Sequence, residues 1–122
     1  MTKLDPQFRK ALQEFLSSPI RNQWIMTPQM EVYVRKGGHM LNQHMYMFLD
    51  LANITVYEQS QGIFKQTLEV FKELSSPSLQ GVYIENVLNP QLAEYLRRLA
   101  ATEPASHWSE ETRCFAWLAE QA

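Results

Sequence analysis

The stretch MYMFLDLANITVYEQSQGIFKQTLEVFKEL, residues 45–74, decides the fold that this sequence predicts. It begins as an apolar run, passes through a polar turn with one glycine, Gly62, and continues as an amphipathic pattern. We interpret it as a strand whose chain reverses straight into a helix. The first backbone N–H groups of such a helix lack partners within it and lie at the positive end of its dipole. The junction therefore suits an anion, and we expect an anionic cofactor there.

Composition limits the classes of protein to which the chain can belong. Its 122 residues suit one domain, 1–122, with a sizeable core. The net charge of −2 gives no broad basic field for duplex nucleic acid, so we expect no nucleic acid partner. The single cysteine, Cys114, has no disulfide partner, and no apolar run approaches the ~20 residues that span a bilayer. We therefore expect a cytoplasmic protein without signal peptide or membrane segment.

Helix signals stand on both sides of the decisive stretch. Asp5-Pro6 and Asn89-Pro90 each combine an N-cap with a proline at the first helical position. Apolar residues recur at helical spacing after both pairs and after Gly62, which predicts three amphipathic helices. The three stripes are Phe8, Leu12, Phe15 and Leu16; Ile63, Phe64, Leu68, Phe71 and Leu74; and Leu92, Tyr95, Leu96 and Leu99.

Strands are predicted before and after the central helix. Residues 30–34, MEVYV, are followed by Lys36-Gly37-Gly38, which predicts a hairpin whose return strand begins near residue 39. The apolar run 45–57 is longer than a typical strand, so we expect a break around residue 42 or a bulge near residue 53. Residues 81–88, GVYIENVL, predict a strand parallel to that run, reached through a right-handed crossover. The fold class is therefore α/β or α+β, with an antiparallel hairpin leading into a partly parallel sheet.

Two segments have no decisive periodicity. Residues 21–29 suit a loop or a short strand. Ser109-Glu110-Glu111 could cap a helix that carries Phe115 and Leu118, whereas residues 113–118 suit an edge strand equally well.

The order of these elements and two short motifs resemble the GNAT superfamily of N-acetyltransferases, which bind acetyl-CoA. The turn 59–64, QSQGIF, lies on the family's pyrophosphate signature Q/R-x-x-G-x-G/A, with Gln59 first and Gly62 as the central glycine. The segment GVYIENVLN followed by PQLAEYLRRL is similar to the family's fifth strand and next helix. In that match, Asn89 stands at the asparagine that helps hold the cofactor. The resemblance favours a strand at residues 113–118.

The resemblance implies that acetyl-CoA is the cofactor and that two splayed parallel strands hold its pantetheine arm. Residues 51–55 would line one side of the arm, residues 87–89 the other, and the turn 59–64 would hold the pyrophosphate. The cofactor-binding residues implied in this way are Leu51, Asn53, Ile54, Thr55, Gln59, Ser60, Gln61, Gly62, Ile63, Phe64 and Asn89.

Acetyl transfer needs a base for the attacking amine and an acid for the leaving thiolate. Asp50 and Glu85, one on each central strand, are the candidate bases; each equally suits an edge charge or a hydrogen-bond partner. The family's acid is commonly a tyrosine seven residues after the asparagine, a position that Leu96 holds here. The neighbouring Tyr95 is the candidate acid, although it points about 100° away on the helix and equally suits the core or the surface.

Departures from the family pattern keep two hypotheses open. Phe64 stands where the signature has Gly or Ala, Leu96 replaces the tyrosine, and Leu99-Ala100-Ala101 hold the place of a glycine and phenylalanine pair. The first hypothesis is an acetyltransferase that acts on an amine of a small molecule or of a protein. The second is a non-catalytic protein of the same fold whose surface binds another protein.

The histidines and methionines of residues 39–47 and three large aromatic residues suggest no further site. His39 and His44 lie near Met40, Met45 and Met47, but their spacing is not that of one helical face, and methionines in strands usually belong to the core. We therefore expect no metal site. The large apolar side chains that suit a core, a substrate groove or a homodimer contact are Tyr57, Trp108 and Trp117.

Overall fold

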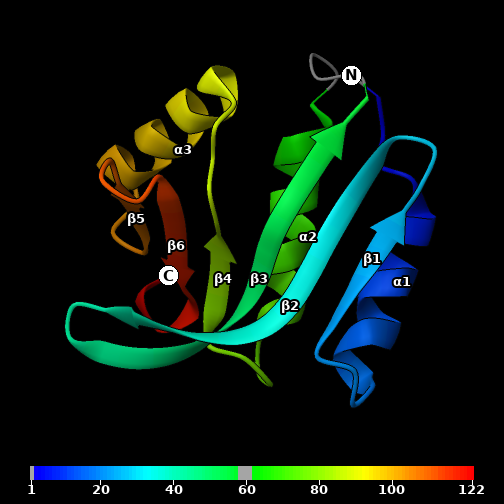
Figure 1. The fold of residues 1–122 in the computed structure, drawn as a ribbon, viewed down its shortest axis with the longest axis horizontal. Coiled ribbons are helices and arrows are strands. Elements are labelled where there is room, and N and C mark those ends of the chain that lie inside the picture. The colour runs from blue at the N-terminus through cyan, green and yellow to red at the C-terminus, as the bar shows by residue number, and fades with distance from the viewer. Residues whose placement is uncertain (1, 58–61) are drawn as a thin grey trace.

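The computed structural model describes residues 2–57 and 62–122, and the strands in these residues form one mixed sheet (Figure 1). The strand order is β1-β2-β3-β4-β6-β5, and every neighbouring pair is antiparallel except β3 and β4, which are parallel. The predicted α+β class, with an antiparallel hairpin leading into a parallel pair, is confirmed. The strands are β1 Asn22–Met26, β2 Met30–Leu41, β3 His44–Val56, β4 Gly81–Ile84, β5 Ser106–Ser109 and β6 Cys114–Leu118.

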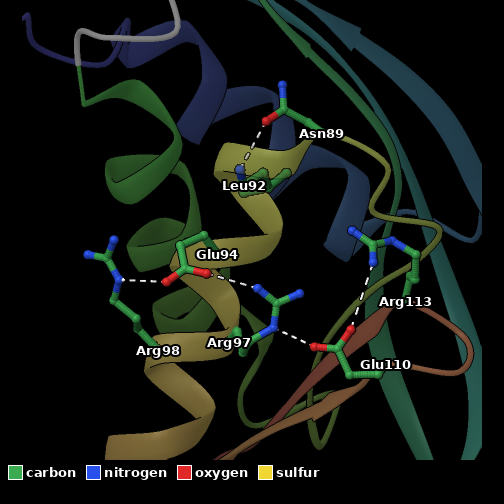
Figure 2. Close-up of polar contacts among 7 residues, drawn as sticks. All are labelled: Asn89, Leu92, Glu94, Arg97, Arg98, Glu110 and Arg113. Atoms are coloured by element: carbon green, nitrogen blue, oxygen red, sulfur yellow. Dashed lines mark hydrogen bonds and ion pairs between the residues drawn. The ribbon is translucent and has the colours of Figure 1, made fainter.

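The three predicted helices begin where their local signals place them. Asp5 Oδ1 accepts a hydrogen bond from the N–H of Gln7 at 2.9 Å, and Asn89 Oδ1 accepts one from the N–H of Leu92 at 3.0 Å (Figure 2). Gly62 precedes the central helix in the left-handed conformation, with φ 76°. No helix in the described part of the chain has the length and apolar character to span a bilayer. The helices are α1 Pro6–Ser17, α2 Ile63–Ser75 and α3 Pro90–Thr102, and a 3-10 turn, η2 Ala119–Gln121, ends the chain.

The alternation of side chains along the strands gives the sheet two different faces. On one face, which we call the helix face, residues such as Leu51 and Ile84 pack against all three helices in the main core. The other face, which we call the open face, carries a smaller cluster built on Phe48 and Leu118. In Figure 1 the tip of the β2–β3 hairpin curls under β4 toward β6, and its residue Tyr46 packs against that cluster. The open face therefore has its own partly covered interior.

The hairpin turn lies elsewhere than the sequence predicted. β2 runs without a break through residues 36–38, and the chain turns at Asn42 and Gln43, whose φ angles are 51° and 68°. Positive φ at both central residues is what a tight hairpin turn of this kind requires, and asparagine tolerates it. Gly37 serves another purpose, because a Cβ there would lie 3.0 Å from the carboxylate of Asp50.

The bulge expected near Asn53 is confirmed. Tyr33 pairs with Asn53 and Val34 pairs with Leu51, so Ala52 is the extra residue on β3. A bulge bends its strand and increases the local twist. The bulge lies directly after Leu51, the last residue of β3 that pairs with β4.

The two undecided segments are both strands. Residues 22–26 form β1, and residues 114–118 form β6, the strand that the family resemblance favoured. The predicted edge position is wrong, because β6 lies between β4 and β5. The alternative of a terminal helix is wrong, since residues 110–113 form a turn between β5 and β6. The sequence did not predict β5, and the predicted strand 81–88 ends earlier, at Ile84.

The close approach of β4 and β6 at Gly81 generates a prediction about stability. A Cβ on Gly81 would lie 2.0 Å from the backbone oxygen of Trp117, so Gly81→Ala must push the strands apart. We expect this variant to lose about 3 kcal/mol or more of unfolding free energy in chemical denaturation. Gly38→Ala is the matched control, because the two atoms nearest to its Cβ would be the flexible thioether sulfurs of Met45 and Met47, at 3.0 and 3.3 Å. Its loss should stay under about 1 kcal/mol, and equal losses would contradict the packing described.

Candidate functional site

β3 and β4 separate directly after Leu51 and Ile84, and a cleft opens between them. These two residues form the last pair of the parallel ladder, and the N–H of Glu85 donates to the oxygen of Leu51 at 3.2 Å. Asn86, two residues after the end of β4, then takes a positive φ of 52° as this segment turns away from β3. The cleft holds a cavity of about 260 Å³. Its lining residues are Leu51, Ala52, Asn53 and Ile54 on one side and Ile84, Glu85, Asn86, Val87, Leu88, Asn89 and Leu92 on the other.

Arg113 holds the far wall of this cleft in place. Its Nε donates to the oxygen of Val87 at 2.8 Å, and the N–H of Val87 donates to the oxygen of Arg113 at 2.9 Å. Figure 2 shows the ion pairs that continue from Arg113 through Glu110 and Arg97 to Glu94 on α3. Beyond Glu85, the segment after β4 is thus attached at Val87 to Arg113, the residue before β6, rather than to β3. Nothing local in the sequence marked Arg113 for this role.

A second cavity, of about 240 Å³, adjoins the cleft on the helix face. Ile54, Asn89 and Leu92 line both cavities, so the two spaces meet along β3 and the start of α3. The ring of Phe64 packs edge-on against Tyr95, with the ring centroids 5.9 Å apart. The other lining residues are Val56, Gly62, Lys65 and Gln91. The N-terminus of α2 therefore opens onto this second cavity.

The residues implied as cofactor ligands fall into separate groups. Ile63 is buried in the core, so only its backbone is available, and Thr55 is exposed and lines neither cavity. Gln59, Ser60 and Gln61 lie outside the described residues. The residues that line one or both cavities are Leu51, Asn53, Ile54, Gly62, Phe64 and Asn89.

Asp50 is the most buried charged group on the open face, with 1% of its surface exposed. Its Oδ2 is 2.8 Å from Nε2 of His39 and 3.6 Å from Nη2 of Arg35, and Arg35 also forms an ion pair with Glu85. Its other oxygen, Oδ1, is buried and accepts no hydrogen bond from the described residues. The structure thus brings both predicted bases into one cluster, together with two residues that the sequence analysis did not assign to catalysis.

The donor atoms of His39, Asp50 and Glu85 lie within 4.8 Å of one another. One imidazole and two carboxylates could hold a divalent cation. Here, however, the guanidinium of Arg35 already provides the positive charge between the two carboxylates. This set differs from the histidines and methionines considered in the sequence, and the expectation of no metal site stays a prediction.

Burial raises the pKa of Asp50 to about 6, because desolvation disfavours the carboxylate. The hydrogen bond from His39 and the charge of Arg35 act in the opposite direction, and the charge of Glu85 adds to the rise. The ring of Tyr83 stacks on His39 with centroids 3.8 Å apart and planes 4° from parallel, and burial raises the pKa of its hydroxyl. The cluster therefore contains a carboxylate that changes charge near neutral pH.

Tyr95, the candidate acid, lies apart from this cluster. It lines the cavity on the helix face, and burial, followed by the charges of Glu103 and Glu69, raises its pKa. Leu96, where the family has its tyrosine, is buried in the core. An acid role for Tyr95 stays a prediction.

Comparison of the sequence with protein-family models and with curated proteins gives no match. The fold is similar to two solved structures. One is a mutant of the toxin AtaT bound to the C-terminus of the antitoxin AtaR and acetyl-CoA: the TM-score is 0.50 at 12% identity, over 75% of this chain and 59% of that one. The other is the KacTA–DNA complex, with a TM-score of 0.50 at 12% identity, over 98% of this chain and 86% of that one.

These similarities concern the fold, since 12% identity carries nothing further. The chain spans 59% of the length of the AtaT chain, less than two thirds. Because the KacTA structure contains DNA, the expectation of no nucleic acid partner stays a prediction. The chain has a GNAT-like mixed α+β fold.

The burial of Asp50 predicts how stability depends on pH. A raised carboxyl pKa means that the folded state favours the protonated form, so this contribution to stability is fully present below about pH 4 and is lost as the pH rises through about 6. The unfolding free energy of Asp50→Asn should therefore rise relative to that of the wild type between pH 4 and pH 7. Urea denaturation of both proteins across this range measures the difference, and a constant difference would contradict the assignment.

Proposed function

We propose that this protein binds acetyl-CoA in the cleft between β3 and β4 and transfers the acetyl group to an amine of a small molecule or a protein. The observation that carries the proposal is the cleft itself, where two parallel strands part after the pair formed by Leu51 and Ile84. The similarity in fold to a toxin whose structure contains acetyl-CoA supports it. The Asn89 and Gly62 positions, which match the family motifs, both line the adjoining cavities.

The cleft suits an extended chain that carries amide groups. Beyond Leu51, the edge of β3 that faced β4 has no strand partner among the described residues, so its backbone groups are available to a ligand. A pantetheine arm can hydrogen-bond to such an edge much as an added strand does. Val87, Leu88 and Asn89 would form the opposite wall, as the family resemblance implies.

The N-terminus of α2 would receive the pyrophosphate. The first N–H groups of a helix favour an anion, and Gly62 and Lys65 at this end both line the second cavity. The ring of Phe64 points toward Tyr95 and leaves a cavity of about 240 Å³ beside it, so the bulky residue does not fill this space. We assign Gln59, Ser60 and Gln61 to the same pyrophosphate site, as the family motif implies.

The proton acceptor would come from the open face, at the start of the cleft. Glu85 lines the cleft, and its carboxylate lies within 4.8 Å of a carboxylate oxygen of Asp50. Both were the bases suggested by the sequence, and both remain candidates within this proposal. Tyr95, on the helix face, remains the candidate acid.

A second candidate function is protein binding without catalysis. Leu96 is buried where the family has its acid, so α3 offers no acid at that position. The AtaT structure includes an antitoxin segment, which supports a protein partner for this fold. A homodimer remains a further prediction.

Binding of acetyl-CoA to the cleft has a direct thermal test. At a hundred times its dissociation constant, the cofactor should stabilise the protein by about 2.7 kcal/mol and raise its melting temperature by several degrees. Leu88→Trp should remove most of this shift, because residue 88 lines the cleft and is 68% exposed, so the larger ring fills the cleft without disturbing the core. Ile20→Trp is the matched control, since residue 20 is 50% exposed and lines neither cavity.

The absence of any shift at millimolar acetyl-CoA would contradict the proposal. An equal loss in both tryptophan variants would show that the ligand binds elsewhere. Catalysis is measured separately, as release of the CoA thiol with a panel of small amines and proteins. Binding without release across that panel would favour the non-catalytic function.

A further inference from the structure

His39 and Asp50 form a hydrogen-bonded dyad on the open face of the sheet. We propose that His39 accepts the proton from the attacking amine and that Asp50 positions its imidazole. The inference deepens the proposed acetyl transfer and rests on it. The sequence suggested only Asp50 or Glu85 for the base; the dyad becomes visible when β2 and β3 pair.

Asp50 is poorly placed to contact an amine itself. It is 1% exposed, one of its oxygens bonds to His39, and the other is buried. Glu85 is more accessible, but its Oε2 is engaged in an ion pair with Arg35. A substrate must reach the group that takes its proton, and Asp50 offers no accessible oxygen.

His39 meets this requirement. Its side chain is 22% exposed, and it lines a third cavity, of about 280 Å³, on the open face. Gly37, Gly38 and Asp50 line the same cavity, as do Arg21 and Asn22 from the start of β1. An acceptor amine would approach through this space and reach the imidazole of His39.

The orientation of the imidazole is fixed on two sides. Nε2 lies 2.8 Å from Oδ2 of Asp50, and the ring stacks on Tyr83 with centroids 3.8 Å apart. An ionised carboxylate only accepts hydrogen bonds, so the ring proton sits on Nε2 and the lone pair on Nδ1. Among the described residues, none donates a hydrogen bond to Nδ1. The ring is thus held by Asp50 and Tyr83 with Nδ1 on the side away from the bond to Asp50.

The dyad also lies at the end of the cleft where β3 and β4 begin to separate. Asp50 pairs with Tyr83 in the ladder, one position before the strands separate. The donor atoms of His39 and Glu85 lie within 4.8 Å of each other, and Glu85 lines the cleft. An acyl group at the open-face mouth of the cleft would therefore lie beside the imidazole.

The reaction balances with these groups alone. The amine nitrogen attacks the thioester carbonyl, which forms the new C–N bond, and one proton passes from that nitrogen to Nδ1 of His39. The C–S bond then breaks and its electron pair leaves with the sulfur. In this scheme the imidazolium, rather than Tyr95, returns the proton to the thiolate, which leaves as free CoA thiol, and no further reactant is required.

Charges around the dyad bear on its pH dependence. The nearest charges are the carboxylate of Asp50, whose Oδ2 is 2.8 Å from Nε2 of His39, and the guanidinium of Arg35, 3.6 Å from the same oxygen. Lys36 lines the cavity, but its Nζ donates to the oxygen of Ser18 at 2.6 Å. The other titratable groups near the dyad are Tyr46 with its neighbour Glu120, Tyr83 with its neighbour Cys114, and Glu85.

Substitution of His39 separates a chemical role from a structural one. With an amine that the wild type acetylates, His39→Ala should lower kcat at least 100-fold and leave the acetyl-CoA thermal shift unchanged. Added imidazole should restore part of the rate, which a structural defect would not allow. His44→Ala is the matched control, an exposed histidine on the same hairpin, and should keep the wild-type rate. Wild-type kcat and pH profile in His39→Ala would overturn the proposal.

Asp50→Asn tests the positioning role. The variant should lower kcat with little change in the KM for acetyl-CoA, and its pH profile should move relative to that of the wild type. Nitrogen NMR of the free protein gives a readout that needs no turnover: at pH 8, His39 should carry its proton on Nε2 in the wild type and lose this preference in Asp50→Asn. A proton on Nδ1 in the wild type would overturn the proposal.

The outcomes distinguish this inference from the function on which it rests. If the wild type neither binds acetyl-CoA nor releases thiol, the proposed function fails and the catalytic role of His39 fails with it, whatever tautomer the NMR shows. If the wild type binds and acetylates but His39→Ala does so equally well, only the inference fails.

Discussion

The separation of β3 and β4 after a short parallel ladder is the constraint on which the rest of the structure depends. Backbone groups that leave a ladder must find other partners or face solvent. Arg113 provides those partners for Val87, so the segment after β4 follows β6 and leaves the edge of β3 uncovered. The bulge at Ala52 bends β3 at the same level. These hydrogen bonds keep the segment after β4 away from β3, and the cleft between them is therefore accessible.

The buried charge beside this cleft is costly to the fold. Asp50 has lost almost all contact with water, and one of its oxygens accepts no hydrogen bond from the part of the chain that the structure describes. His39 and Arg35 offset part of the cost, and Gly37 leaves the space that the carboxylate occupies. An apolar residue would fit this strand more cheaply, since burying an incompletely paired carboxylate destabilises a protein. Groups kept in this condition often serve a reaction, which connects the packing of the open face to the proposed chemistry.

Local signals were readable from the sequence, and distant pairings were not. Asp5 and Asn89 cap their helices as expected because a cap depends on residues two or three positions away. The glycines at 37 and 38 misled the hairpin prediction, since a permissive backbone is needed both for a turn and for a closely packed strand. The pair Arg35 and Glu85 is separated by 50 positions, so no spacing rule could identify it. For the site, the motifs placed residues along the cleft, but only strand pairing brought His39 to Asp50.

The claim that the cleft is an acetyl-CoA site is tested most directly by backbone NMR of the full chain during titration with acetyl-CoA. We expect chemical-shift changes concentrated in residues 51–54 and 84–89 and in Gly62, Phe64 and Lys65, which line the cleft and the adjoining cavity. Leu88→Trp should abolish them, and Ile20→Trp should not. Changes confined to another surface, such as the edge strand β1, or no changes at millimolar ligand, would contradict it.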